Sequence, residues 1–219
     1  MGMNVNPRAH LVWDWNGTLI DDLSLVISAT NVVFASVGGP TITPDDHRRG
    51  FRRPISEYYA EILGRPVSAA EFAILNDLFH TTYQAGLPCA LARDALAALR
   101  AWPGTQSLLS MWFHDELVTA VDHHQITSHF TRIDGMRRPL SGAIDHKGPH
   151  LAKHLAALGV DGHEVILIGD TVDDAHAAAS VGARCVLYAG GFTEAAQLAA
   201  TGAPVAMSLQ EAVALAAQV

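Results

Sequence analysis

The chain has 219 residues, and 49% of them are hydrophobic, which suffices for one sizeable domain or for a core domain with a small accessory one. The formal net charge of -8, with charged residues at only 16%, excludes a broadly basic surface, so we expect no nucleic-acid partner. No apolar run reaches membrane-spanning length, and residues 1–10 lack the pattern of a signal peptide. We therefore expect no membrane association and a cytoplasmic location, which Cys89 and Cys185 fit as reduced thiols.

The first informative stretch is an apolar run, residues 11–13, that stops at Asp14 and then turns through Gly17. Buried strands of parallel sheets are almost continuously apolar, and open α/β sheets bind ligands beyond the carboxyl ends of their strands. The pattern therefore predicts a strand that delivers Asp14 to a functional edge of a sheet. The alternative is that Asp14 merely caps a turn, since Asp and Gly are ordinary turn residues.

Residues 23–88 favour several helices in succession and no strand. Apolar residues at helical spacing fill residues 23–35, and Thr43 followed by Pro44 is typical of a helix start. Ser68 and Glu71 form a capping-box pattern that opens another helix.

From residue 92 onward the pattern alternates between helix and strand, which predicts a parallel α/β sheet. We expect a Rossmann-like core made of residues 1–21 and 89–219, with residues 22–88 inserted as a helical domain after the first strand. The predicted strands are 106–111, 164–168, 183–188 and 204–207, and the predicted helices are 93–100, 115–124, 146–158, 172–181, 194–201 and 209–217.

A second apolar strand also ends on carboxylates, at Asp170 and then at Asp173 and Asp174 on the following helical turn. Asp14 and Asp170 are expected to face each other across adjacent strand ends. Converging carboxylates repel one another, and a hard divalent cation with oxygen ligands relieves that repulsion. Mg²⁺ holding a phosphate against a carboxylate nucleophile is the chemistry that this pattern favours, whereas the spacing of a calcium-binding loop is absent.

These two stretches resemble the first and fourth motifs of the haloacid dehalogenase superfamily, whose members are mostly phosphotransferases. Residues 14–18 read D-W-N-G-T where the family has D-x-D-G-T, and residues 169–174 read G-D-T-V-D-D where it has G-D-x-x-x-D. Ser110 matches the second motif, a Ser or Thr at a strand end, and Lys147 matches the third. The helical insertion resembles the cap of the phosphoglycolate phosphatase-like subgroup.

The resemblance implies a nucleophile and a metal site. Asp14 would attack phosphorus and form an aspartyl-phosphate. The Asp14 side chain, the backbone carbonyl of Asn16 and the Asp170 carboxylate would coordinate Mg²⁺, with Asp174 or Asp173 in the outer coordination shell. The partner would be a small phosphorylated metabolite, and the protein a monomer or a homodimer.

The resemblance also implies that Ser110 and Lys147 hold the phosphoryl oxygens and offset charge in the transition state. The residues by themselves leave an alternative for each. Ser110 would then simply end a strand, and Lys147 would be a solvated residue at a helix start.

Asn16 departs from the family pattern, because the phosphatases carry a second Asp there that protonates the leaving oxygen and then activates water. An Asn side chain cannot carry a proton between groups. Acid–base help is worth about 10²- to 10⁴-fold, so its loss should slow hydrolysis without abolishing metal or phosphate binding. Three interpretations follow: substrates with good leaving groups, recruitment of another base, or a weak or inactive relative.

Two other branches of the superfamily are disfavoured. Phosphonoacetaldehyde hydrolases also lack the second Asp, but they need a cap lysine and residues 23–88 contain none. Haloacid dehalogenases work without Mg²⁺ and do not need the motif at Gly169 and Asp170. The expected function is Mg²⁺-dependent hydrolysis of a phosphomonoester, acyl phosphate or phosphoanhydride, and the alternative is a phosphate-ligand or partner-binding protein without useful turnover.

Four arginines concentrate positive charge in the predicted insertion. Arginine suits bidentate anion recognition, so we expect Arg52 or Arg53 to reach a carboxylate or second phosphate of the substrate. The alternative is a solvated helix face that pairs with neighbouring acids. The four residues are Arg48, Arg49, Arg52 and Arg53.

Twelve histidines raise the question of a zinc site. His150 and His154 have four-residue spacing, but no Glu follows His150 as a metalloprotease helix requires. We expect the histidines that could suggest such a site to be surface residues, with His176 or His114 as a candidate substitute base. They are His123, His124, His146, His150, His154 and His176.

Overall fold

The computed structural model describes residues 9–137 and 146–219, and its centre is a six-stranded, fully parallel sheet. The strand order is β3-β2-β1-β4-β5-β6, which confirms the predicted α/β, Rossmann-like class. The strands are β1 (His10–Trp13), β2 (Gln106–Phe113), β3 (Ile133–Met136), β4 (Val165–Gly169), β5 (Arg184–Tyr188) and β6 (Val205–Ala206).

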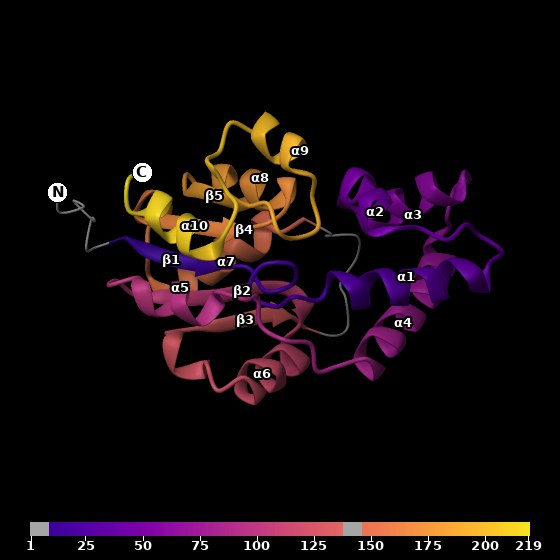
Figure 1. Cartoon of the computed structure of the whole chain (residues 1–219), viewed down its shortest axis with the longest axis horizontal. Helices are drawn as coiled ribbons and strands as arrows, with labels where there is room; N and C mark the ends of the chain where they lie inside the picture. The colour runs from indigo at the N-terminus through magenta and orange to yellow at the C-terminus, as the bar shows by residue number, and fades with distance from the viewer. Residues whose placement is uncertain (1–8, 138–145) are drawn as a thin grey trace.

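Alternating apolar side chains let helices cover both faces of this sheet (Figure 1). Leu11 and Trp13 of β1 share one cluster with α5 (Ala95–Ala101), α6 (His114–His123) and α10 (Leu209–Ala216). Val12 faces the other way and packs with α7 (Gly148–Leu158) and α8 (Val172–Ser180). Burial on both faces explains why these strands are continuous apolar runs in the sequence. The remaining core segments are α9 (Ala195–Ala200) and the 3-10 turns η1 (Thr127–His129) and η2 (Gly162–Glu164).

Five helices lie between β1 and β2 in the chain, and the first four of them lie together beyond the carboxyl ends of the strands (Figure 1). Thr43 caps α2 through the reciprocal capping box with Asp46. Ser68 caps α4 by accepting a hydrogen bond from the Glu71 amide, but the Glu71 carboxylate binds Arg65, so the predicted capping box is only half formed. The helices are α1 (Leu23–Ser36), α2 (Pro44–Gly50), α3 (Ile55–Leu63) and α4 (Ala69–Ala85).

Two features of the sheet differ from the sequence prediction. The edge strand β3 was not predicted, because Asp134 and Gly135 interrupt its short apolar pattern. Strand β2 runs on to Phe113, past the predicted end at residue 111, and its register with β3 shifts between Leu109 and Phe113.

The chain order reverses at β1, which lies between β2 and β4. Connections leave the two sides of such a switch point in opposite directions, which opens a crevice at the carboxyl ends of the strands. Asp14 follows β1 and Asp170 follows β4, so both flank this crevice. None of the helices in residues 9–137 and 146–219 combines the length and the hydropathy of a membrane span.

Candidate active site

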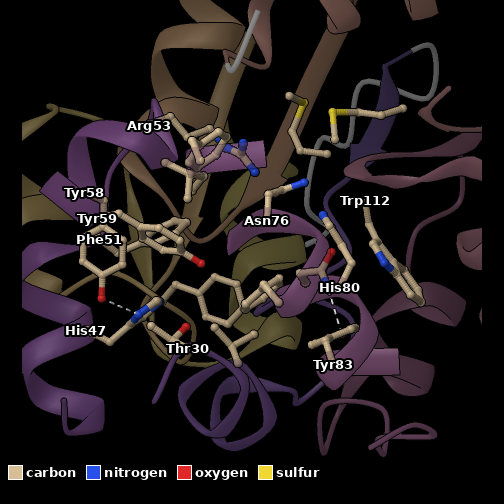
Figure 2. A pocket seen from close by; sticks show the side chains of 18 residues that line it. Thr30, His47, Phe51, Arg53, Tyr58, Tyr59, Asn76, His80, Tyr83 and Trp112 are labelled. Carbon is tan, nitrogen blue, oxygen red and sulfur yellow. Dashed lines mark hydrogen bonds between the residues drawn. The ribbon is translucent and has the colours of Figure 1, made fainter. Parts of the chain in front are cut away.

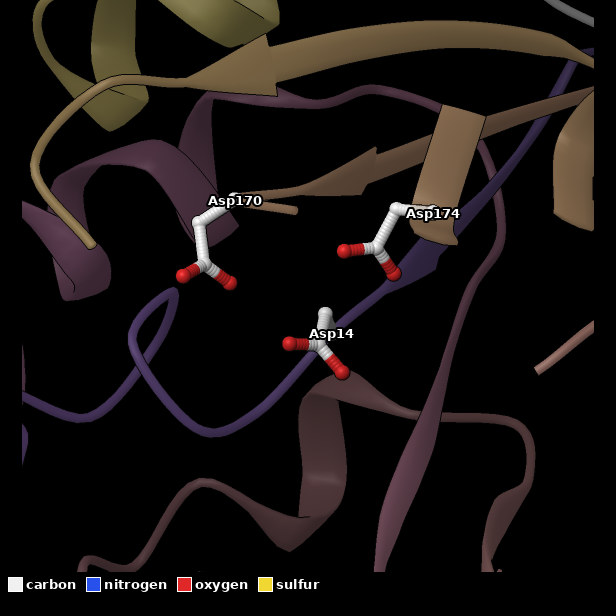
Figure 3. Close-up of side chains that lie close together, drawn as sticks. All are labelled: Asp14, Asp170 and Asp174. Carbon is white, nitrogen blue, oxygen red and sulfur yellow. The ribbon is translucent and has the colours of Figure 1, made fainter. Parts of the chain in front are cut away.

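Three buried carboxylates, those of Asp14, Asp170 and Asp174, meet at the switch point (Figure 3). Trp13 and Ile168 are partners in the β1–β4 ladder, so the residues that follow them arrive side by side. One oxygen of each carboxylate lies within 4.8 Å of the others. Asp174 reaches the same point from the first turn of α8.

Glycines allow the backbone to close around Asp170. Gly17 has φ +71°, and a Cβ there would lie 2.4 Å from Asp170 Oδ2. A Cβ at Gly191 would lie 2.1 Å from the same oxygen. The close approach lets Thr18 Oγ1 and the Phe192 amide donate hydrogen bonds of 2.8 and 2.7 Å to the Asp170 carboxylate. The loop after Asp14 therefore also orients Asp170.

Lys147 is the only lysine that contacts the carboxylate cluster in the described part of the chain. It stands at the N-cap of α7, is buried, and places Nζ 2.5 Å from Asp14 Oδ1 and 2.5 Å from Asp174 Oδ1. Burial lowers the pKa of Lys147, but the two carboxylates outweigh it and raise the pKa above its usual value. Lys147 is therefore a buried cation, not a solvated residue at a helix start.

The charges of the cluster do not balance. Three carboxylates face one ammonium group, which leaves two negative charges among these buried side chains. Burial raises the pKa of Asp14 to about 6 despite Lys147, and burial with the charges of Asp14 and Asp174 raises the pKa of Asp170 well above its usual value. For Asp174, the Lys147 contact outweighs burial and lowers the pKa. A divalent cation has the charge and the preference for oxygen donors that this donor set lacks.

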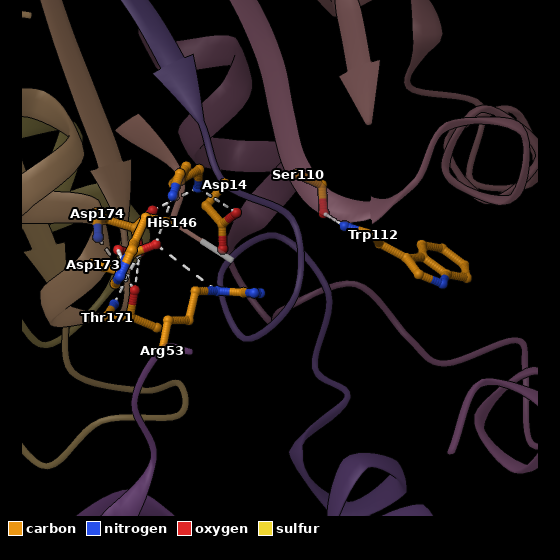
Figure 4. A network of polar contacts seen from close by, with 9 residues as sticks. Asp14, Arg53, Ser110, Trp112, His146, Thr171, Asp173 and Asp174 are labelled. Carbon is orange, nitrogen blue, oxygen red and sulfur yellow. Dashed lines mark hydrogen bonds and ion pairs between the residues drawn. The ribbon is translucent and has the colours of Figure 1, made fainter. Parts of the chain in front are cut away.

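Asp173 lies beside this cluster and binds different groups (Figure 4). The backbone amide of Lys147 donates to Asp173 Oδ2 over 2.9 Å, and His146 Nδ1 lies 3.0 Å from Oδ1. Arg53 Nε lies 3.8 Å from Oδ2. Of the two predicted outer-shell candidates, Asp174 is the one in the carboxylate cluster.

The side chain of Asn16 is held in one orientation by Asp22 and Tyr83. Its amide nitrogen donates to Asp22 Oδ2 over 2.8 Å and to the Tyr83 hydroxyl over 3.0 Å. Tyr83 and the Gly17 amide also donate to Asp22, over 2.7 and 2.8 Å. Burial raises the pKa of Asp22 to about 6, although these donors oppose the shift. Neither Asp22 nor Tyr83 was predicted to contact Asn16. The one signal in the sequence was the carboxylate of Asp22, immediately before an apolar helix.

Ser110 closes the other side of Asn16. Its hydroxyl donates to Asn16 Oδ1 over 3.2 Å and accepts a 3.0 Å hydrogen bond from the Trp112 amide (Figure 4). Ser110 lies in the part of β2 where the register with β3 shifts, two residues past the last β1–β2 pair at Leu108. The serine is buried and its hydroxyl contacts Asn16 in the loop after β1. Ser110 therefore does not simply end a strand.

The two predicted substrate arginines lie in different places. Arg53 lines a cavity of about 40 Å³ together with Asp14, Lys147 and Asp174. Arg52 pairs with Glu61 on the exposed surface, away from that cavity. Arg48 donates to the backbone carbonyl of Gly191, and Arg49 pairs with Asp46.

The expectation that the histidines are surface residues is wrong for His154. It is buried, with Nδ1 2.7 Å from Asp134 Oδ2 and Nε2 2.7 Å from Ser107 Oγ. Helix α7 packs this position against the sheet, where a polar ring needs hydrogen-bond partners. His176 is exposed on α8, and His114 Nδ1 accepts from the Gly135 amide, so neither lines the cavity over Asp14.

Known proteins share parts of this sequence and its fold. Residues 147–212 match a family model described as HAD-hydrolase-like. A curated phosphoglycolate phosphatase from Caulobacter vibrioides is 29% identical over 196 residues, which is 85% of this chain and 81% of the relative.

Solved structures share the whole architecture at low sequence identity. A predicted phosphatase from Clostridium acetobutylicum superimposes with a TM-score of 0.84 at 15% identity, over 97% of this chain and 99% of that one. A haloacid dehalogenase-like family hydrolase from Streptococcus pneumoniae superimposes with a TM-score of 0.80 at 20% identity, over 94% of this chain and 97% of that one. The predicted resemblance is confirmed: the chain is similar to haloacid dehalogenase-like hydrolases and to a curated phosphoglycolate phosphatase.

Proposed function

We propose that the protein is a Mg²⁺-dependent phosphohydrolase of small phosphorylated metabolites that uses Asp14 as its nucleophile. The observation that supports this most is the position of Asp14. Its carboxylate lies in the wall of the 40 Å³ cavity, next to Lys147 and two further carboxylates. A nucleophile, a cation and a metal-binding donor set thus surround one small space.

Asp14, Asp170 and the backbone carbonyl of Asn16 would hold the metal, with Asp174 in an outer position. The metal would supply positive charge that polarises the phosphoryl group. Lys147, which contacts Asp14, would stabilise negative charge on the phosphoryl oxygens. Ser110, whose hydroxyl donates to Asn16 in this structure, would turn that donor to the phosphoryl group.

The reaction has two displacement steps. An oxygen of Asp14 attacks phosphorus while the bond to the leaving oxygen breaks, and the electron pair leaves with that oxygen. A water molecule then attacks the aspartyl-phosphate at phosphorus and gives up its proton to solvent. The bond to Asp14 breaks, the carboxylate is regenerated and inorganic phosphate leaves.

A second candidate function is phosphate-ligand or partner binding without useful turnover. Asn16 favours it, because an amide held by Asp22 and Tyr83 cannot shuttle a proton. Release of inorganic phosphate from acetyl phosphate and from p-nitrophenyl phosphate with Mg²⁺ separates the two functions. We expect turnover that Asp14→Asn abolishes, whereas equal rates for the parent and Asp14→Asn would support binding alone.

We further propose that residues 22–88 act as a cap over the site and residues 1–21 and 89–219 as the catalytic core. The position of α1–α4 beyond the strand ends supports this division. A cytoplasmic monomer or homodimer that binds neither nucleic acid nor membrane accords with the acidic composition.

A further inference from the structure

A second, larger cavity lies between the helices α1–α4 and the strand ends (Figure 2). Its volume is about 140 Å³. Aromatic side chains from α3, α4, β2 and the loop before α9 form much of its wall. The lining also includes the polar side chains of Thr30, Asn76 and His80. The aromatic residues that matter most here are Tyr58, Tyr59, Phe72, Phe79, Trp112 and Phe192.

This cavity adjoins the one over Asp14. Asn16, Phe51, Arg53, Met111 and Phe192 line both cavities. A phosphoryl group placed at Asp14 would therefore have the aromatic cavity as the adjoining space for its leaving group.

The wall is suited to an uncharged ring. Arg53 is the single Arg, Lys, Asp or Glu side chain among the residues that line the cavity in the described chain, and its Nε lies 3.8 Å from Asp173. Burial lowers the pKa of His47, another lining residue, to about 3, so that ring is neutral. An apolar protein cavity of about 150 Å³ holds one benzene molecule, which sets the size of the group that fits here.

The chemistry of Asn16 also favours an aromatic leaving group. Asn16 cannot protonate a leaving oxygen, so the reaction favours one that departs readily as an anion. A phenol has a pKa of about 10, as in tyrosine, whereas bulk water, the reference for a poor oxygen leaving group, has about 15.7. An aryl oxygen therefore needs less protonation than an alkyl oxygen.

We propose that the aromatic cavity is the leaving-group site and that the substrate is a phosphate monoester of a single-ring phenol. The inference rests on the proposed function and specifies its substrate class. Asp14 bonds to phosphorus, the bond from phosphorus to the phenolic oxygen breaks, and the phenolate takes its proton from water. A second water releases inorganic phosphate from Asp14.

The test compares kcat/KM for phenyl phosphate, cyclohexyl phosphate and 2-phosphoglycolate. We expect phenyl phosphate to exceed 2-phosphoglycolate by at least about tenfold, and cyclohexyl phosphate to bind comparably but turn over more slowly, because its leaving oxygen is more basic. A value for 2-phosphoglycolate equal to or above that for phenyl phosphate would overturn the proposal.

A variant that fills the aromatic cavity tests whether the ring of phenyl phosphate binds there. Val26 of α1 lines the cavity, so Val26→Phe should raise KM for phenyl phosphate about tenfold and raise KM for acetyl phosphate, which has no ring, by a much smaller factor. Val32→Phe, on the same helix but 46% exposed, is the matched control and should change neither. Equal losses for both substrates in Val26→Phe would show that the ring does not occupy this cavity.

Binding of phosphate esters to the Asp14→Asn variant tests the cavity without relying on turnover, and so independently of the proposed function. Calorimetric titration with Mg²⁺ present should show phenyl phosphate binding at least about tenfold more tightly than methyl phosphate, and Val26→Phe should remove the difference. If acetyl phosphate turnover proves independent of Asp14, the proposed function fails while this titration still decides the cavity. Equal affinities of the two phosphates would overturn the inference alone.

Discussion

The amide nitrogen of Asn16 lies 2.8 Å from a carboxylate oxygen of the buried residue Asp22. Asn16 stands at the third position of the D-W-N-G-T stretch, where the D-x-D-G-T pattern that it resembles has an aspartate. A carboxylate at position 16 would therefore lie against the carboxylate of Asp22. Two such groups repel and share a proton, so neither acts as an independent acid. The identity of residue 16 is thus coupled to that of residue 22.

We expect Asn16→Asp alone to gain little activity, and the exchange Asn16→Asp with Asp22→Asn to gain up to about 10²-fold in kcat on an alkyl phosphate. The exchange restores a donor and an acceptor across the 2.8 Å contact and frees an acid for the leaving oxygen. The gain should be smaller on phenyl phosphate, whose leaving group needs less protonation. Steady-state rates on cyclohexyl and phenyl phosphate measure both effects. Equal gains from the single and double variants would show that residues 16 and 22 are not coupled.

Lys147→Met should lower the free energy of unfolding by about 3–5 kcal/mol, because it leaves Asp14 and Asp174 as buried charges without their cation. Urea denaturation without Mg²⁺ measures this loss. Lys153→Met, at an exposed position of the same helix, is the matched control and should stay within about 0.5 kcal/mol of the parent. A loss below about 1 kcal/mol in Lys147→Met would contradict the role of Lys147 as the buried counter-ion.

Arg53→Gln should raise KM for anionic phosphate substrates by about tenfold or more, because a charge-assisted hydrogen bond is worth about 1.5–3 kcal/mol. Arg53 lines both cavities, whereas Arg52 pairs with Glu61 on the surface. Arg52→Gln is therefore the control, and its KM should match that of the parent. Steady-state kinetics would exclude the assignment if the two variants behaved alike.

A buried histidine makes folding sensitive to acid. His10 lies 2.7 Å from both Thr105 Oγ1 and Ser107 Oγ, and burial, with the charge of His154, lowers its pKa to about 4. The unfolded chain binds this proton near pH 6.5, so stability from neutral His10 is complete above that pH and is lost as the pH falls toward 4. The full loss is about 3 kcal/mol.

The measurement is the difference in unfolding free energy between the parent and His10→Gln, at steps from pH 7 to pH 4. A difference is needed because Asp22, whose pKa is raised to about 6, changes stability in the opposite direction over nearly the same range. We expect the advantage of the parent to shrink by about 3 kcal/mol as the pH falls. A difference that does not vary with pH would show that His10 does not titrate as described.

The sequence predicted the sheet and the meeting of Asp14 with Asp170, because both follow apolar runs and the carboxyl ends of adjacent parallel strands share an edge. It predicted no partner for Asn16, because Tyr83 reaches this loop from the far end of the inserted helices, 67 residues later. Adjacent arginines also look equivalent in a sequence. Only the path of the chain between α2 and α3 sends Arg53 to the cavity and Arg52 to Glu61.

His154 shows the same limit in the core. Its pattern in α7 is that of any polar residue on an amphipathic helix, and its burial depends on Ser107 and Asp134, which come from two different strands. Strand β3 was not predicted because its sequence has a weak local strand pattern. Its pairing with β2, which the local sequence does not reveal, stabilises it as a strand.

Nucleophilic catalysis by Asp14 is tested by chemical trapping of the aspartyl-phosphate. The enzyme is mixed with phenyl phosphate or acetyl phosphate and Mg²⁺, quenched in acid and treated with borohydride, which reduces an acyl phosphate to an alcohol. Peptide mass analysis should then find homoserine at position 14 in the parent and no such change in Asp14→Asn. Release of inorganic phosphate at a normal rate, with Asp14 unmodified at every quench time, would contradict nucleophilic catalysis by Asp14.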